Sequence, residues 1–174
     1  GWRRAQALAG DSGSPCQAAA NLRLITEIQG THAVSPLAGK AVTVRGMVTG
    51  VVAETGSHRG FYLLDSPRTP QSERLASRGV YVWLGALPGI ATPKSGQRVA
   101  VQGTVTEYGN MTQVRARSVD TCAAAKSTDS ETASGREGES FPWTPASLTA
   151  EAVSSATLEA FEGMPVTLEG PWRV

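Results

Sequence analysis

The sequence is poor in the residues on which most catalytic and metal-binding sites depend. Its 174 residues include two histidines, His32 and His58, two cysteines and three phenylalanines. Neither histidine stands in an acidic cluster, and two distant cysteines cannot form the Cys-x-x-Cys pair typical of zinc sites. No apolar run approaches the roughly 18 residues that a membrane-spanning helix requires. We therefore predict a chain without a metal ion, a cofactor or a membrane segment.

Glycine and proline, by contrast, are plentiful. The chain holds 19 glycines and 10 prolines, and 40% of its residues are hydrophobic. Such a composition favours an all-β fold with many turns over a helical bundle. The length is that of one domain of roughly 100 to 150 residues with extensions.

The net charge of +1 conceals two blocks of opposite sign. Residues 37 to 119 contain ten lysines and arginines against four acidic residues, a net charge of +6. Residues 120 to 170 contain nine acidic residues against two basic ones, a net charge of −7. This asymmetry indicates that the first block binds a polyanion.

Five valine-rich segments of the basic block alternate between apolar and polar residues, which is the periodicity of a β-strand. Gly46 predicts a bulge or bend in the first strand, and Gly109 and Asn110 predict a tight hairpin between the last two, because both accept a positive φ. Residues 21–30 are compatible with a strand or a single helical turn. The pattern predicts a five-stranded, OB-like Greek-key barrel with irregular N- and C-terminal extensions. Its strands are residues 41–53, 61–65, 79–84, 97–108 and 111–119.

Cys16 and Cys122 bracket these strands. A disulfide between them would join both ends of the barrel and close a loop of about 100 residues, which stabilises a fold by up to about 4.7 kcal/mol. It would also place the protein in an oxidising compartment, either secreted or periplasmic. The alternative is two unrelated buried thiols in a cytosolic protein, because two cysteines alone are weak evidence of a bridge.

We divide the chain into a flexible leader (1–20), the barrel (21–122), an acidic linker rich in Ser, Ala and Gly (123–145) and a final part (146–174). In this final part, residues 161–170 repeat the pattern of residues 37–46, with Gly, Val-Thr and a last Gly at matched spacing. Three interpretations stay open. The repeat opens a second barrel, forms a strand that docks on the edge of the first, or is a chance match.

Several of these segments resemble the OB-like domain of bacterial secreted nucleases, which precedes a catalytic domain of the endonuclease/exonuclease/phosphatase type. Residues 161–164 also resemble the segment that follows that domain. The resemblance covers roughly residues 16 to 122 and consists of strand signatures without catalytic residues. It departs from the family in the loop of residues 66–74, which is mostly basic where family members often carry an Asp-rich loop, so no metal role is expected there. The matching residues are 25–30, 35–39, 42–49, 60–65 and 103–113.

The resemblance implies a parent protein that is a metal-dependent extracellular endonuclease, with this chain as a non-catalytic accessory domain beside the catalytic one. The family's catalytic site needs His, Asp, Asn and Glu around a metal, and this chain has only two isolated histidines. OB barrels bind nucleic acid across their second and third strands, stacking bases on aromatic rings and following the phosphates with basic residues. The expected partner is therefore single- or double-stranded nucleic acid, DNA foremost.

We predict nine binding residues, each with a plainer interpretation. The aromatic residues could instead pack under the loop of residues 66–77 or against another domain, and the others could be ordinary solvated side chains. The competing function is a structural or protein-docking module without nucleic-acid affinity. A weaker third hypothesis has the acidic residues 129–139 occupy the basic face as a mimic of the ligand. The nine residues are Arg45, His58, Arg59, Tyr62, Tyr81, Trp83, Arg98, Arg115 and Arg117.

Overall fold

The structure, a computed structural model, describes residues 16, 19, 21–53, 55–65, 76–86, 88–122, 145–150, 153 and 158–170. Most of the predicted leader, the loop of residues 66–75 and nearly all of the predicted linker lie outside this part. No helix in the described ranges is long and apolar enough to cross a membrane. The elements are β1 (Leu22–Arg23), α1 (Ile25–Gln29), β2 (Ala41–Ala53), β3 (Gly60–Leu64), β4 (Gly79–Trp83), β5 (Arg98–Tyr108), β6 (Met111–Thr121), β7 (Ala146–Thr149) and β8 (Val166–Glu169).

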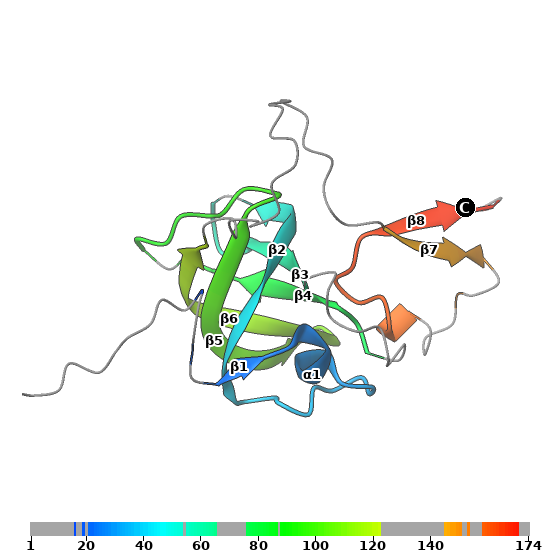
Figure 1. Ribbon diagram of the computed structural model, residues 1–174, viewed down its shortest axis with the longest axis horizontal. Helices are drawn as coiled ribbons and strands as arrows, with labels where there is room; N and C mark the ends of the chain where they lie inside the picture. The colour runs from blue at the N-terminus through cyan, green and yellow to red at the C-terminus, as the bar shows by residue number, and fades with distance from the viewer. Residues whose placement is uncertain are drawn as a thin grey trace, which may run out of the picture.

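Five strands close into a barrel, as Figure 1 shows. The order around it is β2-β3-β4-β6-β5, and β5 pairs again with β2. All of these pairs are antiparallel except β4 with β6, which run parallel. A barrel that follows its five strands in the order first, second, third, fifth, fourth has the Greek-key connectivity of the OB fold. The predicted fold class is confirmed.

The interior of the barrel is filled by the apolar side chains that occupy every second position of each strand. Val44, Phe61, Val82 and Val114 are fully buried members of one core cluster. Because successive side chains of a strand point to opposite faces, the polar parity of the same strands forms the outer surface. The alternation seen in the sequence therefore corresponds to inside and outside of the barrel.

Residues 21–30, whose sequence is compatible with a strand or a helical turn, form both a short strand and a helix. β1 pairs in parallel with β2, and α1 follows at one end of the barrel (Figure 1). The Glu27 carboxylate accepts the Leu24 N–H at 2.8 Å, which satisfies one of the orphan donors at the helix start. Ile25 and Ile28 are completely buried among the barrel valines. The helix therefore closes this end of the core.

Gly46, predicted to mark a bulge or a bend, lies where two strands approach closely and is not at a register shift of β2. A Cβ at this position would lie 2.3 Å from the Leu64 carbonyl oxygen, so β2 and β3 approach more closely than any side chain would allow. The register shifts of β2 come later, between Val48 and Gly50 and between Val51 and Ala53. The hairpin prediction is confirmed, since Gly109 and Asn110 have φ of +58° and +63° between β5 and β6.

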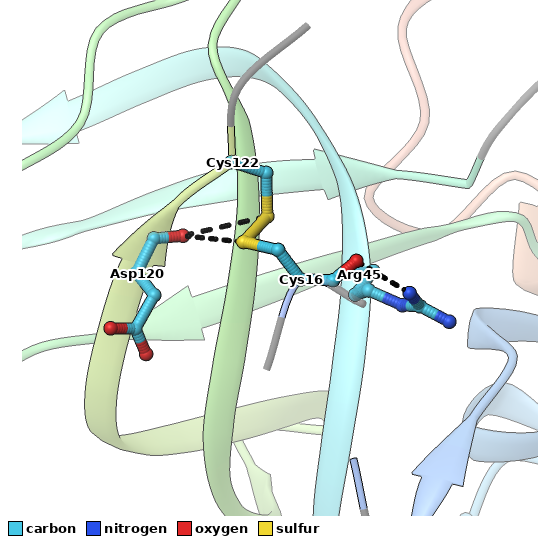
Figure 2. Close-up of a disulfide and its surroundings, with 4 residues drawn as sticks. All are labelled: Cys16, Arg45, Asp120 and Cys122. Carbon is cyan, nitrogen blue, oxygen red and sulfur yellow. Dashed lines mark hydrogen bonds between the residues drawn. A yellow bond between two sulfur atoms is a disulfide. The ribbon is translucent and has the colours of Figure 1, made fainter. Parts of the chain in front are cut away.

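The predicted disulfide is present and joins Cys16 to Cys122 across a sequence separation of 106 residues. The Cα atoms are 5.5 Å apart, within the ordinary range for a bridge. Figure 2 shows that the Arg45 guanidinium, on β2, donates a hydrogen bond of 2.8 Å to the Cys16 carbonyl. The Asp120 carbonyl oxygen lies 4.0 and 3.9 Å from the two sulfur atoms. The bridge thus holds the chain before β1 against the end of β6.

Beside the barrel, β7 and β8 form a separate two-stranded parallel sheet. The turn before β8 repeats the turn before β2: the Lys40 N–H donates to the Leu37 carbonyl at 2.9 Å, and the Met164 N–H donates to the Phe161 carbonyl at 3.0 Å. Each turn contains a glycine of positive φ, and each leads into a strand with a parallel partner. The sequence repeat is therefore also a repeat of local structure, while the division of the chain into units stays a prediction. The two glycines are Gly39 (φ +77°) and Gly163 (φ +67°).

Candidate functional site

The outer face of β3, β4 and β6 holds all three of the predicted aromatic residues. Tyr62 of β3 stands opposite Tyr81 of β4, and Tyr81 stands opposite Gln113 of β6. In the next row, Trp83 of β4 stands opposite Arg115 of β6. These strands are the second, third and fifth of the barrel, so the rows lie on the face that OB folds use for oligonucleotides.

Arg115 and Trp83 form the most distinctive contact of this face. The Arg115 guanidinium carbon lies 5.3 Å from the centroid of the Trp83 ring, within the range of a cation–π interaction. Trp83 is also fixed from the side, because its Nε1–H donates to the Ser57 carbonyl at 2.8 Å. A ring and a cation are thereby held next to each other on a surface where Arg115 is exposed.

The two tyrosines of the face are placed differently. Their ring centroids are 5.2 Å apart with a tilt of 53°. Tyr81 keeps only 8% of its surface exposed, and its hydroxyl donates to the His58 carbonyl at 3.1 Å. Burial, and then the neighbouring Tyr62, raise the pKa of Tyr81 above its ordinary value. Tyr62 and Trp83 are half-buried, so they are the more accessible of the three predicted aromatic residues.

The predicted arginines do not gather on one face. Arg117 follows Arg115 on β6 and is exposed, but it lies beyond the stretch that pairs with β4. Arg45 stands opposite Ala100, and Arg98 opposite Met47, on the β2–β5 side of the barrel. The structure brings Arg115 to the aromatic rows, places Arg117 next along the strand, and puts Arg45 and Arg98 elsewhere.

The loop between β2 and β3 borders the Trp83 end of the face. His58 is exposed there. Arg59 holds the loop to the connection after β4, since its Nε–H donates to the Gly85 carbonyl at 3.2 Å and its Nη1–H to the Ile90 carbonyl at 2.9 Å. The Arg59 guanidinium therefore has a structural use that the sequence did not indicate.

The hairpin between β5 and β6 borders the other end. Tyr108 at its start is 69% exposed, which makes it the most exposed large ring in the described barrel. OB folds use both this loop and the one between their first two strands to contact oligonucleotides. Tyr108 is not among the nine predicted binding residues, although the sequence predicts the hairpin. The signal was available, because an aromatic residue beside a Gly-Asn turn is placed at a loop tip.

One further residue that the sequence did not predict as a site residue, Glu162, lies near the hairpin. The Glu162 carboxylate accepts the Thr112 N–H at 2.9 Å and the Gln29 side-chain N–H at 3.3 Å. Burial raises the pKa of Glu162, the two hydrogen bonds lower it, and the carboxylates of Glu159 and Glu107 raise it further. Among the described residues, no group of three or more His, Cys, Asp and Glu side chains could hold a metal ion.

Comparison with known proteins gives likeness at the level of structure alone. No protein-family model matches the chain, and no curated protein matches it. Similar solved structures include the hypothetical protein ygiW from E. coli (16% identity, 49% of this chain and 77% of the other, TM-score 0.33). Another is the S. pombe Stn1-ten1 complex (11% identity, 48% and 59%, TM-score 0.36). A third is the N-terminal domain of PriB protein from Thermoanaerobacter tencongensis (20% identity, 48% and 97%, TM-score 0.33). The assignment of the OB-type barrel rests on the strand order and the closing β2–β5 pair.

Proposed function

We propose that this chain is a non-catalytic nucleic-acid-binding module, and that it binds single-stranded nucleic acid on the outer face of β3, β4 and β6. The observation that supports it is the Trp83 ring under the Arg115 guanidinium, next to the Tyr62–Tyr81 pair on the strands that OB folds use. A flat ring can stack on any base, and a cation beside it can contact the phosphate backbone. Binding of this kind has little sequence preference.

We further propose, from the resemblance, that the module serves a secreted bacterial nuclease and lies next to its catalytic domain. The disulfide supports a secreted or periplasmic location, since such bridges persist in oxidising compartments. In that arrangement the module increases the local concentration of nucleic acid near the catalytic domain. DNA is the ligand we favour.

The test is fluorescence anisotropy of a labelled single-stranded oligonucleotide over a range of salt concentrations. We expect affinity to fall with salt, and an Arg115→Glu, Arg117→Glu variant to reduce the slope of log K against log salt by about 1.4, since each phosphate contact contributes about 0.7. An Arg23→Glu, Lys40→Glu variant carries the same change of charge on exposed residues outside this face and is the matched control. Equal losses in both variants would show that only net charge matters.

Trp83→Ala tests the stacking part of the proposal. Loss of one stacked base corresponds to a roughly 5- to 150-fold weaker affinity. An unchanged affinity in this variant would exclude Trp83 as a stacking platform.

The second candidate function is a protein-docking or structural module. Two observations favour it: Tyr81 is buried under the β2–β3 loop, and residues 161–164 already contact this side of the barrel. No binding of the oligonucleotide even at low salt would support this second function.

A further inference from the structure

Residues 161–164, called the cap below, are anchored to the barrel at the hairpin end of the outer face. The Glu162 carboxylate accepts hydrogen bonds from the Thr112 N–H of β6 and from Gln29 of α1. The Ser77 hydroxyl, just before β4, donates to the Glu162 carbonyl at 2.5 Å. Three separate parts of the barrel thus hold one residue of the cap.

A contact between two glycines brings the cap onto the strand itself. A Cβ on Gly79 would lie 2.4 Å from both the carbonyl carbon and the oxygen of Gly163, and a Cβ on Gly163 would lie 3.0 Å from the Val80 nitrogen. Gly79 has the same parity as Tyr81 and Trp83, so this contact is on the outer face. Backbone atoms cannot rotate away as a side chain can, and any residue other than glycine at position 79 would displace the cap.

The position of the cap affects ligand binding because the outer face extends along β4. Along β4, the face runs from Trp83, beside the β2–β3 loop, to Gly79, beside the β5–β6 hairpin, a span of about 13 Å for four residues. The cap covers the Gly79 end, and the rows of Tyr81 and Trp83 lie beyond it. A strand of nucleic acid that followed the whole face, from one bordering loop to the other, would meet the cap.

The charge of this end also opposes a ligand while the cap is in place. Glu162 belongs to the cap, Glu159 lies two residues before it in the chain, and the Glu107 carboxylate of β5 accepts the Thr112 hydroxyl at 3.0 Å. Like charges at close range repel, so a phosphate is disfavoured beside these carboxylates. The uncovered end of the face, with Arg115 and Trp83, is positively charged instead.

On the basis of the proposed function, we propose that the cap competes with nucleic acid for the hairpin end of the outer face and thereby limits the length of single strand that the barrel holds. With the cap docked, the ligand contacts the Trp83 and Tyr62 rows alone. With the cap released, it extends toward Tyr108 and the hairpin. The cap is thus a determinant of the footprint of the site.

The experiment releases the cap from either side and measures affinity against ligand length. Gly79→Ala places a methyl group against the cap, and Gly163→Val strains the turn, because a β-branched residue disfavours a φ of +67°. Gly50→Ala is the matched control, since a Cβ there meets no atom within 4 Å. Hydrogen exchange of the Thr112 amide, which the Glu162 carboxylate protects, reports whether the cap is released, and the core amides of Val82 and Val114 report that the barrel is folded.

The ligands are labelled oligothymidylates of about 4 to 16 nucleotides, the range of site sizes in OB folds. We expect affinity for wild type and Gly50→Ala to level off at a short length. Both cap variants should continue to gain affinity with length, by roughly 5- to 150-fold for each additional stacked base.

Other outcomes separate this inference from the proposed function. If exchange shows a released cap and the length profile is unchanged, the cap does not compete with the ligand and the inference is wrong. The inference is also wrong if neither variant releases the cap. If the cap is released and no protein binds any oligothymidylate, the proposed function itself is wrong, and this inference falls with it.

Discussion

Removal of the Cys16–Cys122 disulfide should cost this barrel a large part of its stability. The bridge spans a sequence separation of 106 residues, so it closes the whole barrel into one loop. In the chain-entropy model, the restriction of the unfolded chain by a loop of this size is worth about 4.7 kcal/mol at 25 °C. For about 100 residues, the entropy of unfolding makes this equivalent to a decrease of roughly 20 °C in Tm.

The assay is urea unfolding followed by tryptophan fluorescence, on wild type and on a Cys16→Ser, Cys122→Ser variant. The variant should have a lower midpoint and a larger m-value, because its unfolded chain is free to expand and exposes more surface. An Arg45→Ala variant gives an internal control. With the bridge intact, it removes the bond to the Cys16 carbonyl, a bond from a charged donor that contributes roughly 1.5 to 3 kcal/mol. Without the bridge, the same substitution should cost less, because residue 16 is no longer held beside β2.

Two results would refute this reasoning. A loss below about 1 kcal/mol with an unchanged m-value would show that the bridge does not restrict the unfolded chain as the loop model requires. Equal costs of Arg45→Ala with and without the bridge would show that the Arg45 contact and the disulfide act independently.

Three further predictions concern Gly46, Asn110 and Glu162. Gly46→Ala should destabilise the barrel by about 1 to 3 kcal/mol or more in urea unfolding, because its Cβ would meet the Leu64 carbonyl. Gly50→Ala should change stability by less than about 1 kcal/mol. Similar effects of the two substitutions would contradict the close approach of β2 and β3. Asn110→Gly should be nearly neutral and Asn110→Val should cost about 1 to 2 kcal/mol, because φ is +63° at this position, and an unaffected valine variant would argue against the turn. Burial raises the pKa of Glu162, so the native state binds this proton more tightly than the unfolded state does. The stability that Glu162 contributes is therefore greatest below the ordinary carboxyl pKa and is lost as pH rises through the raised pKa. Glu162→Gln should therefore show a weaker fall in urea midpoint between acidic and neutral pH than wild type, and it should be the more stable of the two at neutral pH; parallel curves would show that Glu162 does not titrate in this range.

Features of the fold that depend on residues close together in the chain could be predicted from the sequence. Alternation along β2, β5 and β6 predicts which side chains face the core, since the period of a strand is two residues. The Gly109-Asn110 turn is specified by the positive φ that both residues accept. Helix α1 was the exception among local features, because five residues are too few to show a helical period, and its burial depends on the open end of a barrel.

The candidate site was predicted only in part, because parity assigns a side chain to the inside or the outside but not to a side of the barrel. Arg45 and Arg115 both alternate with valines, yet one lies beside the disulfide and the other over Trp83. Tyr81 alternates as an outward-facing residue and is nevertheless buried, because its hydroxyl is hydrogen-bonded to the His58 carbonyl of the β2–β3 loop. The cap depends on a contact between a glycine of β4 and a glycine 84 positions further along the chain, and no local sequence pattern predicts such a contact.

The two-stranded sheet of β7 and β8 has a consequence for how this protein behaves in concentrated solution. A closed barrel has no free strand edge, because β5 returns to β2. Within the part of the chain that the structure describes, β8 pairs with β7 alone, and its side chains Val166 and Leu168 are exposed. An unprotected edge of this kind is a template for another chain, and Glu169 is the only charged residue in the strand that could discourage it. We therefore expect self-association through backbone hydrogen bonds to involve the two-stranded sheet of β7 and β8 rather than the closed barrel.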